Sequence, residues 1–440
     1  MTPLSEEVVL EKTEKRKVMS RTPGPILEDL STFQYVTGID IGMQSCLVCV
    51  LKPDKQMVIK PTTFANAAGG FTELFERLAA LGVAPGEILI GLEATSRYGE
   101  NLYHALQKQG YTLCLLHPAQ THQWSKRRGL RAKTDKLDAT TIARVLLSGE
   151  ARRGYVPSEL VASYRELIRL HTHLADEAAR YKNEIHALLQ VLFPEYSQVF
   201  ADPCRVTALS LLKRYPGARA VTTAGAETIA RFLHELAPRN YGRRTAEQLL
   251  TLAQHSVSTH LADEARAKSL AILCDQLLHT QANLAQVEKD IEALIERDPH
   301  TKGIQALAEF GSITTAVLRA ELGDVDRFGH SKQVVAYAGL DLEIKESGKW
   351  KGKAKLSKRG SGLLRRMLYL AAVRSVRLDS SPFGTYYHRL VERGLPKGAA
   401  LIAVMRKMLI VAAHLIKTGE QYDPTKVGAN YAASPRGEAA

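Results

Sequence analysis

The segment QYVTGIDI (34–41) has the apolar, β-branched pattern of a strand, with Asp40 placed between two glycines. CLVCVL (46–51) follows it as a neighbouring strand. Further predicted strands and helices then alternate: FTELFERLAALG (71–82), EILIGLEA (87–94), YGENLYHALQKQG (98–110) and YTLCLLH (111–117). This alternation predicts an α/β domain with parallel strand pairing and a sheet covered by helices.

Composition indicates a globular protein that binds a polyanion. The chain has 440 residues, of which 45% are hydrophobic, enough for several domains with real cores. Lys and Arg number 59 against 46 Asp and Glu, giving a net charge of +13 and a pI of about 9.4. An excess of this size favours nucleic acid over a membrane surface as the partner.

The cysteines and the N-terminal residues bear on the cellular compartment. The five cysteines are few and odd in number, which argues against a disulfide framework and fits a reducing compartment. Cys46 and Cys49 form a C-x-x-C, but on a strand they face opposite sides, so we expect buried small side chains. The charged N-terminal segment has no signal-peptide core, and no uninterrupted apolar run is long enough to span a membrane. We expect a cytoplasmic protein, associated with the nucleoid when bound to DNA, without a membrane partner.

The middle of the chain is predicted to be helical. One apolar stripe comprises Leu167, Leu170, Leu174, Tyr181, Ile185, Leu188 and Leu192. A second comprises Leu270, Leu273, Leu277, Leu284, Val287, Ile291 and Leu294, interrupted by Thr280. Two such helices predict an antiparallel or a dimer-forming coiled coil. Residues 195–260 between them are mixed helix and loop, with no assigned role.

The segment IQALAEFGSITTAVLRAELGD (304–324) predicts two helices around a glycine turn. It resembles a helix-hairpin-helix, whose turn amides can hold a phosphate, although an ordinary helical hairpin predicts the same pattern. The predicted organisation is therefore a mobile extension (1–33), an α/β domain (34–157), a helical coiled-coil region (158–298), a mostly α C-terminal domain (299–425) and a disordered tail (426–440).

Four carboxylates mark a candidate metal site. Asp40 lies within a strand, Glu93 at the end of a later strand, and Asp135 and Asp138 share one face of the helix predicted in KTDKLDATTIARVLL (133–147). Acids this close repel one another unless divalent cations are bound, and Mg²⁺ or Mn²⁺ suits all-oxygen ligands. By itself this helix favours another interpretation, in which Asp135 is an N-cap and Asp138 reaches back to it.

A basic segment follows Ser347, which stands at a Ser-Gly turn. Its cations are Lys349, Lys351, Lys353, Lys355, Lys358, Arg359, Arg365 and Arg366, with no acid among them. The four alternating lysines would share one face of a strand, and the whole segment favours contact with phosphates. Ser347 is a candidate nucleophile; Ser357 and Ser361 are rivals in the same segment.

These motifs together resemble the DEDD-type insertion-sequence transposases (the IS-one-ten family with its IS-eleven-eleven branch). GIDIG, GLEATSRYG and KTDKLDA are similar to the family's RuvC-like, RNase H-like domain, and YAGL, ESG and LSKRGSGLLRRMLYLAA to its C-terminal transposase domain. The order of acids on two strands and one helix fits an RNase H-like sheet. Two local departures are Asp341-Leu342, where x-Pro is usual, and EFGS in the hairpin turn.

The resemblance implies a transposase or recombinase of mobile DNA. It implies that Asp40, Glu93, Asp135 and Asp138 hold metal, that Ser347 forms a covalent link to DNA, and that a structured bridge RNA guides a homo-oligomer, a dimer or tetramer, to donor and target DNA. An alternative is a RuvC-like junction nuclease in which Ser347 is only a turn residue, and a second is a non-catalytic nucleic-acid scaffold. The sequence leaves open the target, the guide sequence, the oligomer size and whether the site assembles in cis or in trans.

Overall fold

The computed structural model describes residues 30–93, 97–127, 135–258, 261–343, 346–347, 350–351, 355–378 and 380–427. The chain divides into two compact units, each described here by itself. Unit 1 comprises Met1–Ser158, Asp324–Gly362 and Ala432–Ala440, and unit 2 comprises Glu159–Gly323 and Leu363–Tyr431. This division cuts across the predicted block 299–425, and the domain boundaries drawn from the sequence stay predictions.

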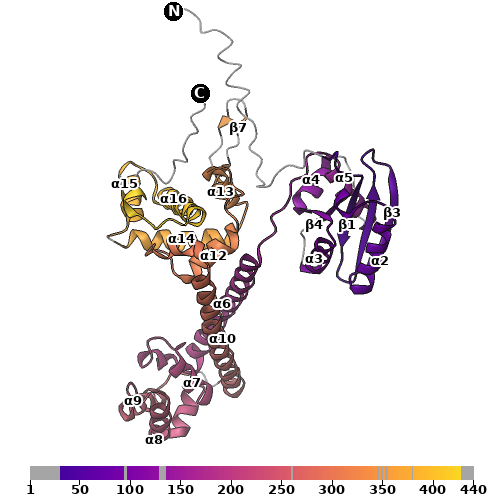
Figure 1. Ribbon diagram of the computed structural model, residues 1–440. Coiled ribbons are helices and arrows are strands. Elements are labelled where there is room, and N and C mark those ends of the chain that lie inside the picture. The colour runs from indigo at the N-terminus through magenta and orange to yellow at the C-terminus, as the bar shows by residue number, and fades with distance from the viewer. Residues whose placement is uncertain are drawn as a thin grey trace, which may run out of the picture. The chain divides into compact units, whose positions relative to one another are not determined.

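Unit 1 contains a five-stranded sheet (Figure 1). Its strands are β1 (Tyr35–Ile41), β2 (Ser45–Leu51), β3 (Met57–Ala65), β4 (Ile88–Glu93) and β5 (Thr112–Leu116), in the spatial order β3-β2-β1-β4-β5. β1, β4 and β5 are parallel, as predicted. β2 is antiparallel to β1 and to β3, so the prediction is wrong there, because the three residues between β1 and β2 are too few for a parallel crossover.

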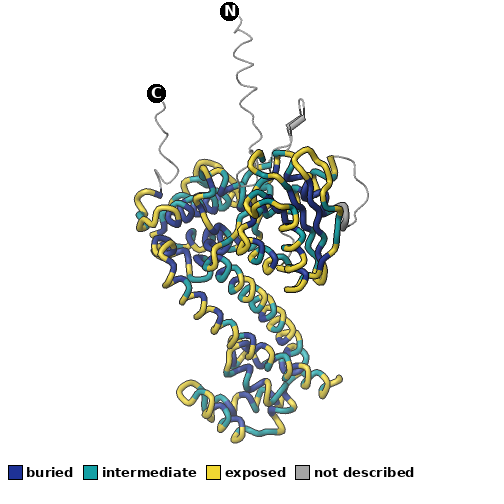
Figure 2. Tube along the Cα trace, turned by 45° about the vertical axis from the view of Figure 1, so that its right-hand side comes forward, coloured by how far each residue is buried: buried dark blue, intermediate teal, exposed yellow. Residues whose placement is uncertain are grey.

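Helices cover both faces of this sheet. On one face α2 (Ala68–Ala79) and α3 (Glu100–Lys108) pack through Leu74, Leu78, Leu102 and Leu106. On the other, α5 (Asp135–Leu146) packs through Ile142, Ala143 and Leu146, with Trp124 of α4 (Pro118–Arg127) beside it. Figure 2 shows the buried strands between these layers. The mixed sheet is consistent with the expected RNase H-like domain.

Cys46 and Cys49 lie in different cores, one on each face of the sheet, which confirms the prediction from strand alternation. All five cysteines are buried with free thiols. Burial raises the pKa of Cys46 to about 11 and that of Cys114 to about 12. At neutral pH these thiols are therefore protonated and behave as small apolar side chains.

The ends of the described chain differ slightly from the sequence boundaries. Leu30 and Phe33 pack against the core under α5, inside the segment predicted as an extension. The rest of that segment, residues 1–29, lies outside the described residues. At the other end the 3₁₀ turn η5 (Pro424–Val427) buries Val427, one residue beyond the predicted start of the tail.

The second part of unit 1 is a helix followed by a hairpin of short strands. The helix is α13 (Ser331–Tyr337), and the strands are β6 (Leu342–Glu343), β7 (Glu346–Ser347), β8 (Trp350–Lys351) and β9 (Lys355–Leu356). β6 pairs with β9 and β7 with β8, both antiparallel. Lys351 and Lys355 thus belong to two different strands, and the single lysine strand predicted above is wrong for them because the chain folds back on itself. Lys349 and Lys353 lie outside the described residues.

Unit 2 is helical, and its longest helices pack along one another (Figure 1). They are α6 (Glu159–Leu192) and α10 (Asp263–Arg297). Leu170 is 45% exposed, contrary to the predicted stripe, because α6 instead buries Val161, Tyr164 and Ile168 in that part. On α10 the predicted seam is mostly buried, and Thr280 lies within it with its hydroxyl donating to the Gln276 carbonyl at 2.8 Å. The coiled coil itself stays a prediction.

The residues between these helices, which the sequence did not place, form a helical head. It comprises η3 (Pro194–Gln198), α7 (Val206–Arg214), α8 (Ala218–Leu236) and α9 (Arg243–Gln254). One core joins them to the adjoining ends of α6 and α10, through Tyr196, Leu212, Leu233 and Leu249 among others. The described residues of this segment, 195–258, therefore form a packed substructure made mostly of helices.

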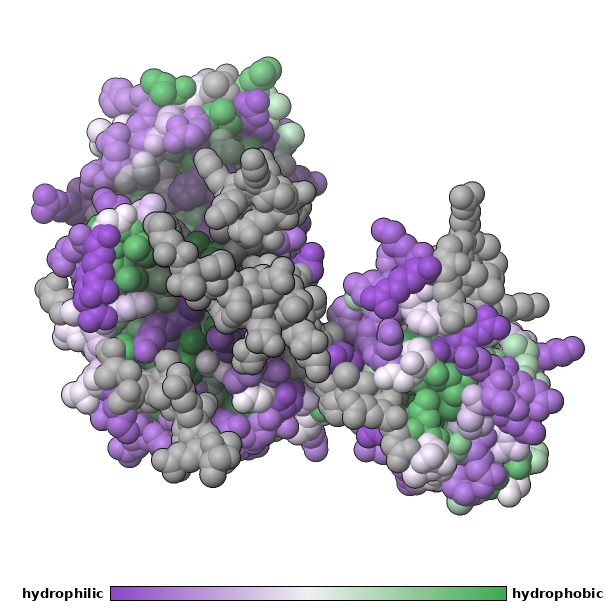
Figure 3. Space-filling model, turned by 90° about the horizontal axis from the view of Figure 1, so that it is seen from above, coloured by the Kyte–Doolittle hydropathy of each residue, from purple (hydrophilic) through white to green (hydrophobic). Residues whose placement is uncertain are grey.

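The remaining helices of unit 2 form its C-terminal body. They are η4 (Pro299–Thr301), α11 (Lys302–Gln305), α12 (Ser312–Leu322), α14 (Gly362–Val376), α15 (Pro382–Glu392) and α16 (Lys397–Thr418). α16 is long and apolar enough to cross a membrane by length and composition alone, but more than half of its most apolar stretch is buried inside the protein. Figure 3 shows mainly hydrophilic side chains on the face it draws, with smaller hydrophobic areas.

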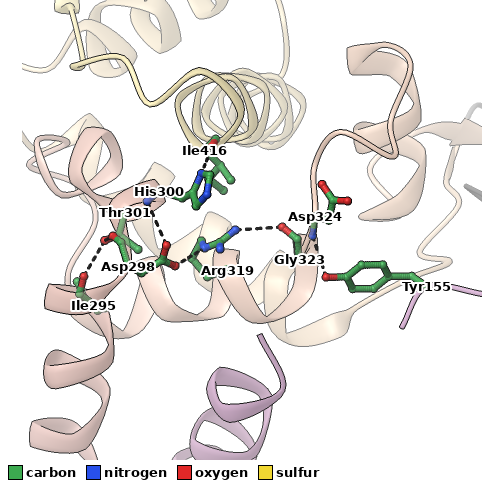
Figure 4. Close-up of polar contacts among 9 residues, drawn as sticks. All are labelled: Tyr155, Ile295, Asp298, His300, Thr301, Arg319, Gly323, Asp324 and Ile416. Carbon is green, nitrogen blue, oxygen red and sulfur yellow. Dashed lines mark hydrogen bonds and ion pairs between the residues drawn. The ribbon is translucent and has the colours of Figure 1, made fainter. Parts of the chain in front are cut away.

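A buried ion pair joins α10 to α12 (Figure 4). Nε of Arg319 lies 2.6 Å from Oδ2 of Asp298, and both side chains are almost fully buried. Arg319 also donates to the Gly323 carbonyl, and Asp298 accepts from the backbone N–H of His300. His300 Nδ1 lies 2.9 Å from the carbonyl of Ile416, so this nitrogen carries the proton. Loss of one partner from such a pair costs about 3–5 kcal/mol, because the remaining charge is left buried without compensation.

Candidate functional site

Asp40 and Glu93 occupy matching places on two neighbouring parallel strands. The register pairs Gly38 with Gly91 and Ile39 with Leu92, so Asp40 and Glu93 follow next on β1 and β4. Adjacent strands lie about 4.8 Å apart, and alternation puts both side chains on the face that carries Gly38 and Gly91. The fold thus brings together two acids that lie 53 positions apart in the sequence.

The same two glycines let α5 approach that face closely. A Cβ atom on Gly38 would lie 2.1 Å from the carbonyl oxygen of Ala139, and one on Gly91 would lie 2.7 Å from Leu146. A side chain at either position would push the helix away from the sheet. Each acid therefore stands two residues after the glycine that seats the helix, in the patterns Gly-Ile-Asp and Gly-Leu-Glu.

α5 carries the other two predicted acids in its first turn. It begins at Asp135, and Asp138 directly precedes Ala139, the residue seated on Gly38. The side chain of Asp138 is half-buried, whereas that of Asp135 lies outside the described residues. Both positions suit the positive end of the helix dipole, so the capping interpretation is compatible with this placement. The structure therefore places the backbone of Asp138 close to the strand of Asp40.

The donor chemistry of these acids fits a hard divalent cation, since carboxylate oxygens are what Mg²⁺ and Mn²⁺ prefer. Among the side chains that the structure describes, no three acids, histidines or cysteines lie close enough to hold a metal ion, and Asp135 is not in that set. The charge of Asp40 adds to the effect of burial in raising the pKa of Cys46.

Thr121 is a residue of this region that sequence reasoning missed. Its hydroxyl lies 2.8 Å from Oε2 of Glu93 and 2.9 Å from the carbonyl of Pro118, and its side chain is only 7% exposed. Thr121 is the buried residue of α4. A helix with so little apolar surface has no stripe in its sequence, so no periodic signal pointed to it.

The strand β7 holds Ser347, which pairs with Trp350 of β8. The side chain of Ser347 lies outside the described residues, as do those of Lys349, Lys351 and Lys353. Lys355, Lys358 and Arg359 are exposed. Nη2 of Arg359 lies 3.8 Å from Oε1 of Glu343 across the hairpin. In unit 2, Nη1 of Arg366 lies 3.5 Å from Oδ1 of Asp176, and both side chains are largely exposed. Surface pairs of this kind are weak and leave these cations able to bind phosphates.

The rival serine Ser357 has a specific partner. Its hydroxyl donates to Oδ1 of Asp341, and its backbone N–H donates to the Asp341 carbonyl at 3.0 Å. Asp341 belongs to the Asp341-Leu342 pair, one of the two departures from the family pattern that the motifs resemble. Ser357 is therefore held to Asp341 by two hydrogen bonds, one from its side chain and one from its backbone.

The turn before α12, predicted as a helix-hairpin-helix, borders a cavity of about 370 Å³. Its lining includes Ser312 and Thr314 at the start of α12, Arg374 of α14, and Glu288 and Glu292 of α10. The hydroxyl of Ser312 donates to Glu292 at 3.3 Å. Carboxylates beside the helix start disfavour an anion there, and the phosphate-binding turn stays a prediction.

Comparison with known proteins gives two family matches and several full-length relatives. Residues 37–194 match a family model described as a transposase of the DEDD type, and residues 304–388 match the model of the transposase IS116/IS110/IS902 family. A protein of insertion element IS110 from Streptomyces coelicolor is 24% identical, over 90% of this chain and 96% of its own length. A protein of insertion element IS900 from Mycobacterium paratuberculosis is 27% identical, over 88% of this chain and 96% of its own length.

A pilin gene-inverting protein from Moraxella bovis is 22% identical, over 88% of this chain and 97% of its own length. The two family models cover both segments that carry the sequence motifs, the sheet with the acids and the hairpin with Ser347. The resemblance seen in the motifs is confirmed: this chain is a DNA transposase that belongs to the IS110 family of DEDD-type insertion-sequence transposases.

Proposed function

We propose that this transposase cleaves and exchanges DNA strands through a covalent link to Ser347, with divalent metal held by four carboxylates and with its targets chosen by a structured RNA. The observation that supports the proposal best is the placement of Asp40 and Glu93. They occupy neighbouring register positions at the ends of β1 and β4. Both lie on the sheet face against which α5 packs, and Asp138 is in the first turn of α5. Both acids are half-buried at neighbouring strand positions, where carboxylates are favourable only with a hydrogen-bonding or cationic partner.

Asp40, Glu93, Asp135 and Asp138 would hold Mg²⁺ or Mn²⁺. When bound, such ions help to activate a nucleophile and to stabilise the leaving oxygen of a phosphodiester. Two carboxylates 4 Å apart repel by about 4 kcal/mol at an effective dielectric constant of 20, so the cluster is unfavourable without cations. The chain's own contribution is to hold the four oxygen donors on one strand pair and one helix turn.

Ser347 would supply the nucleophilic oxygen. In the first step its hydroxyl loses a proton, the Oγ–P bond forms, and the bond from phosphorus to a sugar oxygen breaks, which leaves a free sugar hydroxyl. The phosphoserine link keeps the energy of the broken phosphodiester, so a sugar hydroxyl can reverse the step and rejoin DNA without an external energy source. The exposed cations Lys355, Lys358 and Arg359 would neutralise backbone phosphates beside it. A junction nuclease that uses water would form no such adduct.

Thr121→Val should weaken metal binding, because valine keeps the shape of threonine but cannot donate to Glu93. Loss of a hydrogen bond that orients a metal-binding carboxylate typically costs about 10- to 100-fold in metal affinity. We expect Thr121→Ser to bind Mn²⁺ nearly as the unchanged protein does, measured by calorimetric titration and by the Mn²⁺ concentration needed for half-maximal cleavage. Thr172→Val on α6, whose hydroxyl donates only to the Ile168 carbonyl, is the control. Unchanged Mn²⁺ affinity in Thr121→Val would exclude this role.

The guide RNA is inferred from what the chain lacks as well as from the family. The sequence offers cationic surface, which binds phosphates without distinguishing bases, and we found no recognition motif for DNA in it. A recombinase still needs a defined target, and base pairing with a bound RNA supplies one while the protein holds the backbone. We propose that the α/β domain and the adjoining long helices bind an RNA encoded beside the gene.

The test is recombination between donor and target DNA by purified protein with and without that RNA. Changing the pairing loops of the RNA should redirect the product junctions while the protein stays the same. A scrambled RNA of equal length is the control for nonspecific polyanion effects. Site-specific recombination by RNase-treated protein would exclude RNA guidance, and would direct attention to α8 and α9 of the helical head as candidate DNA-reading elements.

A further inference from the structure

The hairpin that carries Ser347 is closed at its base by Asp341 and Ser357. β6 and β9 form the stem, with Leu342 paired to Leu356, and β7 and β8 lie beyond it with Ser347 paired to Trp350. At the base of the stem the Ser357 N–H donates to the Asp341 carbonyl, and the Ser357 hydroxyl donates to the Asp341 carboxylate. A backbone and a side-chain hydrogen bond thus join the same two residues.

Just outside the Asp341–Ser357 pair, the backbone of the chain entering the hairpin packs directly against the backbone of the chain leaving it. Gly339 has a φ of +68°, and a Cβ there would lie 2.4 Å from the carbonyl oxygen of Arg359. A Cβ on Gly360, whose φ is +127°, would lie 2.0 Å from the carbonyl oxygen of Tyr337. The Lys358 N–H donates to the Gly339 carbonyl at 3.2 Å. The chain that leaves α13 and the chain that returns from the hairpin are therefore held side by side in one arrangement.

We propose that the Asp341–Ser357 hydrogen bond is a positioning element that sets the direction of the hairpin and so places Ser347 for attack. A stem of two residue pairs is marginal by itself, because short two-stranded hairpins are barely stable in water. A charge-assisted hydrogen bond at its end is one of the stronger contacts available to it. The inference rests on the proposed role of Ser347 as the nucleophile.

Ser357 has a positioning role in this proposal. A carboxylate can also activate a serine hydroxyl for attack, and the position of the covalent adduct distinguishes the two roles. The hydroxyl hydrogen of Ser357 is engaged by a carboxylate of the same hairpin, in a stem whose two strands are tied to each other on either side. Ser347 lies farther along the hairpin, so the pair acts on it through the stem and not by contact. A misplacement of about 1 Å is enough to slow a reaction about 100-fold, which gives such a distant contact a large effect.

The test uses the full chain with its RNA and a DNA substrate that traps the covalent adduct. Ser357→Ala should lower the single-turnover rate of adduct formation about 10- to 100-fold while the KM for DNA changes less than about twofold. Ser357→Thr keeps the hydroxyl and should restore most of the rate. Asp341→Asn keeps an acceptor and should be milder than Asp341→Ala. Because the two residues share one contact, the double alanine variant should be no slower than either single variant.

Ser269→Ala, on the exposed side of α10, removes a hydroxyl that donates only to a helix carbonyl and is the matched control. Circular dichroism of each variant checks that the fold persists. An unchanged adduct rate in Ser357→Ala, or full additivity in the double variant, overturns the positioning role. An adduct mapped to Ser357 overturns it as well. Ser347→Ala is measured in parallel: an adduct that persists there refutes the nucleophile assignment, whatever Ser357→Ala does.

Discussion

Asparagine in place of Asp40 or Asp138 is expected to lower metal-dependent DNA cleavage by about 1,000-fold while the α/β part of the chain stays folded. Divalent ions held at the proposed site would contribute several kcal/mol of transition-state stabilisation, and each 1.36 kcal/mol is a factor of about ten in rate. Asp135→Asn should behave in the same way. The fold should survive, because asparagine has the shape of aspartate and removes a repelling charge from the cluster.

Two measurements separate a metal ligand from a helix cap. Cleavage is followed in Mg²⁺, in Mn²⁺ and in excess chelator, and thermal unfolding is followed with and without Mn²⁺. The unchanged protein should gain stability from Mn²⁺, whereas each asparagine variant should gain little, since only ligands that bind the folded state raise its stability. Glu100→Gln, in the first turn of α3, removes an exposed carboxylate of the same domain and is the control. Full cleavage by Asp138→Asn, or in chelator, would return this residue to the capping interpretation.

The parts of the fold that the sequence predicted are those with a strong apolar pattern. β1, β2, β4 and β5 are buried strands, and α2 and α3 have clear apolar stripes. The sequence did not predict β3, because this strand lies at the edge of the sheet, has mostly exposed or half-buried residues and contains a proline. It did not predict α4, because the residue that this helix buries, Thr121, is polar. Edge strands and surface helices are stabilised by the neighbouring elements that they pack against, so their own sequences carry little signal.

The long helix α6 shows a second limit. Its sequence offers two apolar stripes, one through Leu167, Leu170 and Leu174 and one through Val161, Tyr164 and Ile168. Both have helical spacing, so periodicity does not choose between them. The structure buries the second stripe because α12 and α10 pack on that side. Where two faces are apolar, the packing partner decides which is buried, and a single sequence does not contain that partner's position.

The positions of Asp40 and Glu93 on their strands were predictable for a different reason. A carboxylate inside a strand pattern stands out because its burial is unfavourable, and a glycine two residues before it marks the place where a helix approaches. Thr121 was not predictable, because its link to Glu93 exists only once α4 is placed. Ser357 was a rival of Ser347 in the sequence. Its contact with Asp341, which lies 16 positions away, was not predictable either, because it exists only once the hairpin has formed.

Ser347→Ala is expected to abolish the covalent protein–DNA adduct while leaving nucleic-acid binding within about twofold, because one neutral hydroxyl contributes little beside a cationic surface. The adduct is detected with a trapping DNA substrate in denaturing gels, and its position by mass spectrometry of the linked peptide. Ser361→Ala, in the same segment, is the control and should keep the adduct. A linkage at Ser357, at Ser361 or at a tyrosine would show that the nucleophile was assigned wrongly.

The same variants reveal how the site assembles. Ser347 and the four acids lie in separate parts of the sequence, so the proposed mechanism requires the hairpin and the sheet to come together for reaction. If each active site combines the serine of one subunit with the acids of another, then a mixture of Ser347→Ala and Asp138→Asn proteins regains cleavage that neither has alone, since some mixed sites contain both intact parts. If both parts come from one subunit, every site in the mixture lacks one of them and the mixture stays inactive. Cleavage by the mixture, compared with each variant at the same total concentration, therefore decides between assembly in trans and assembly in cis.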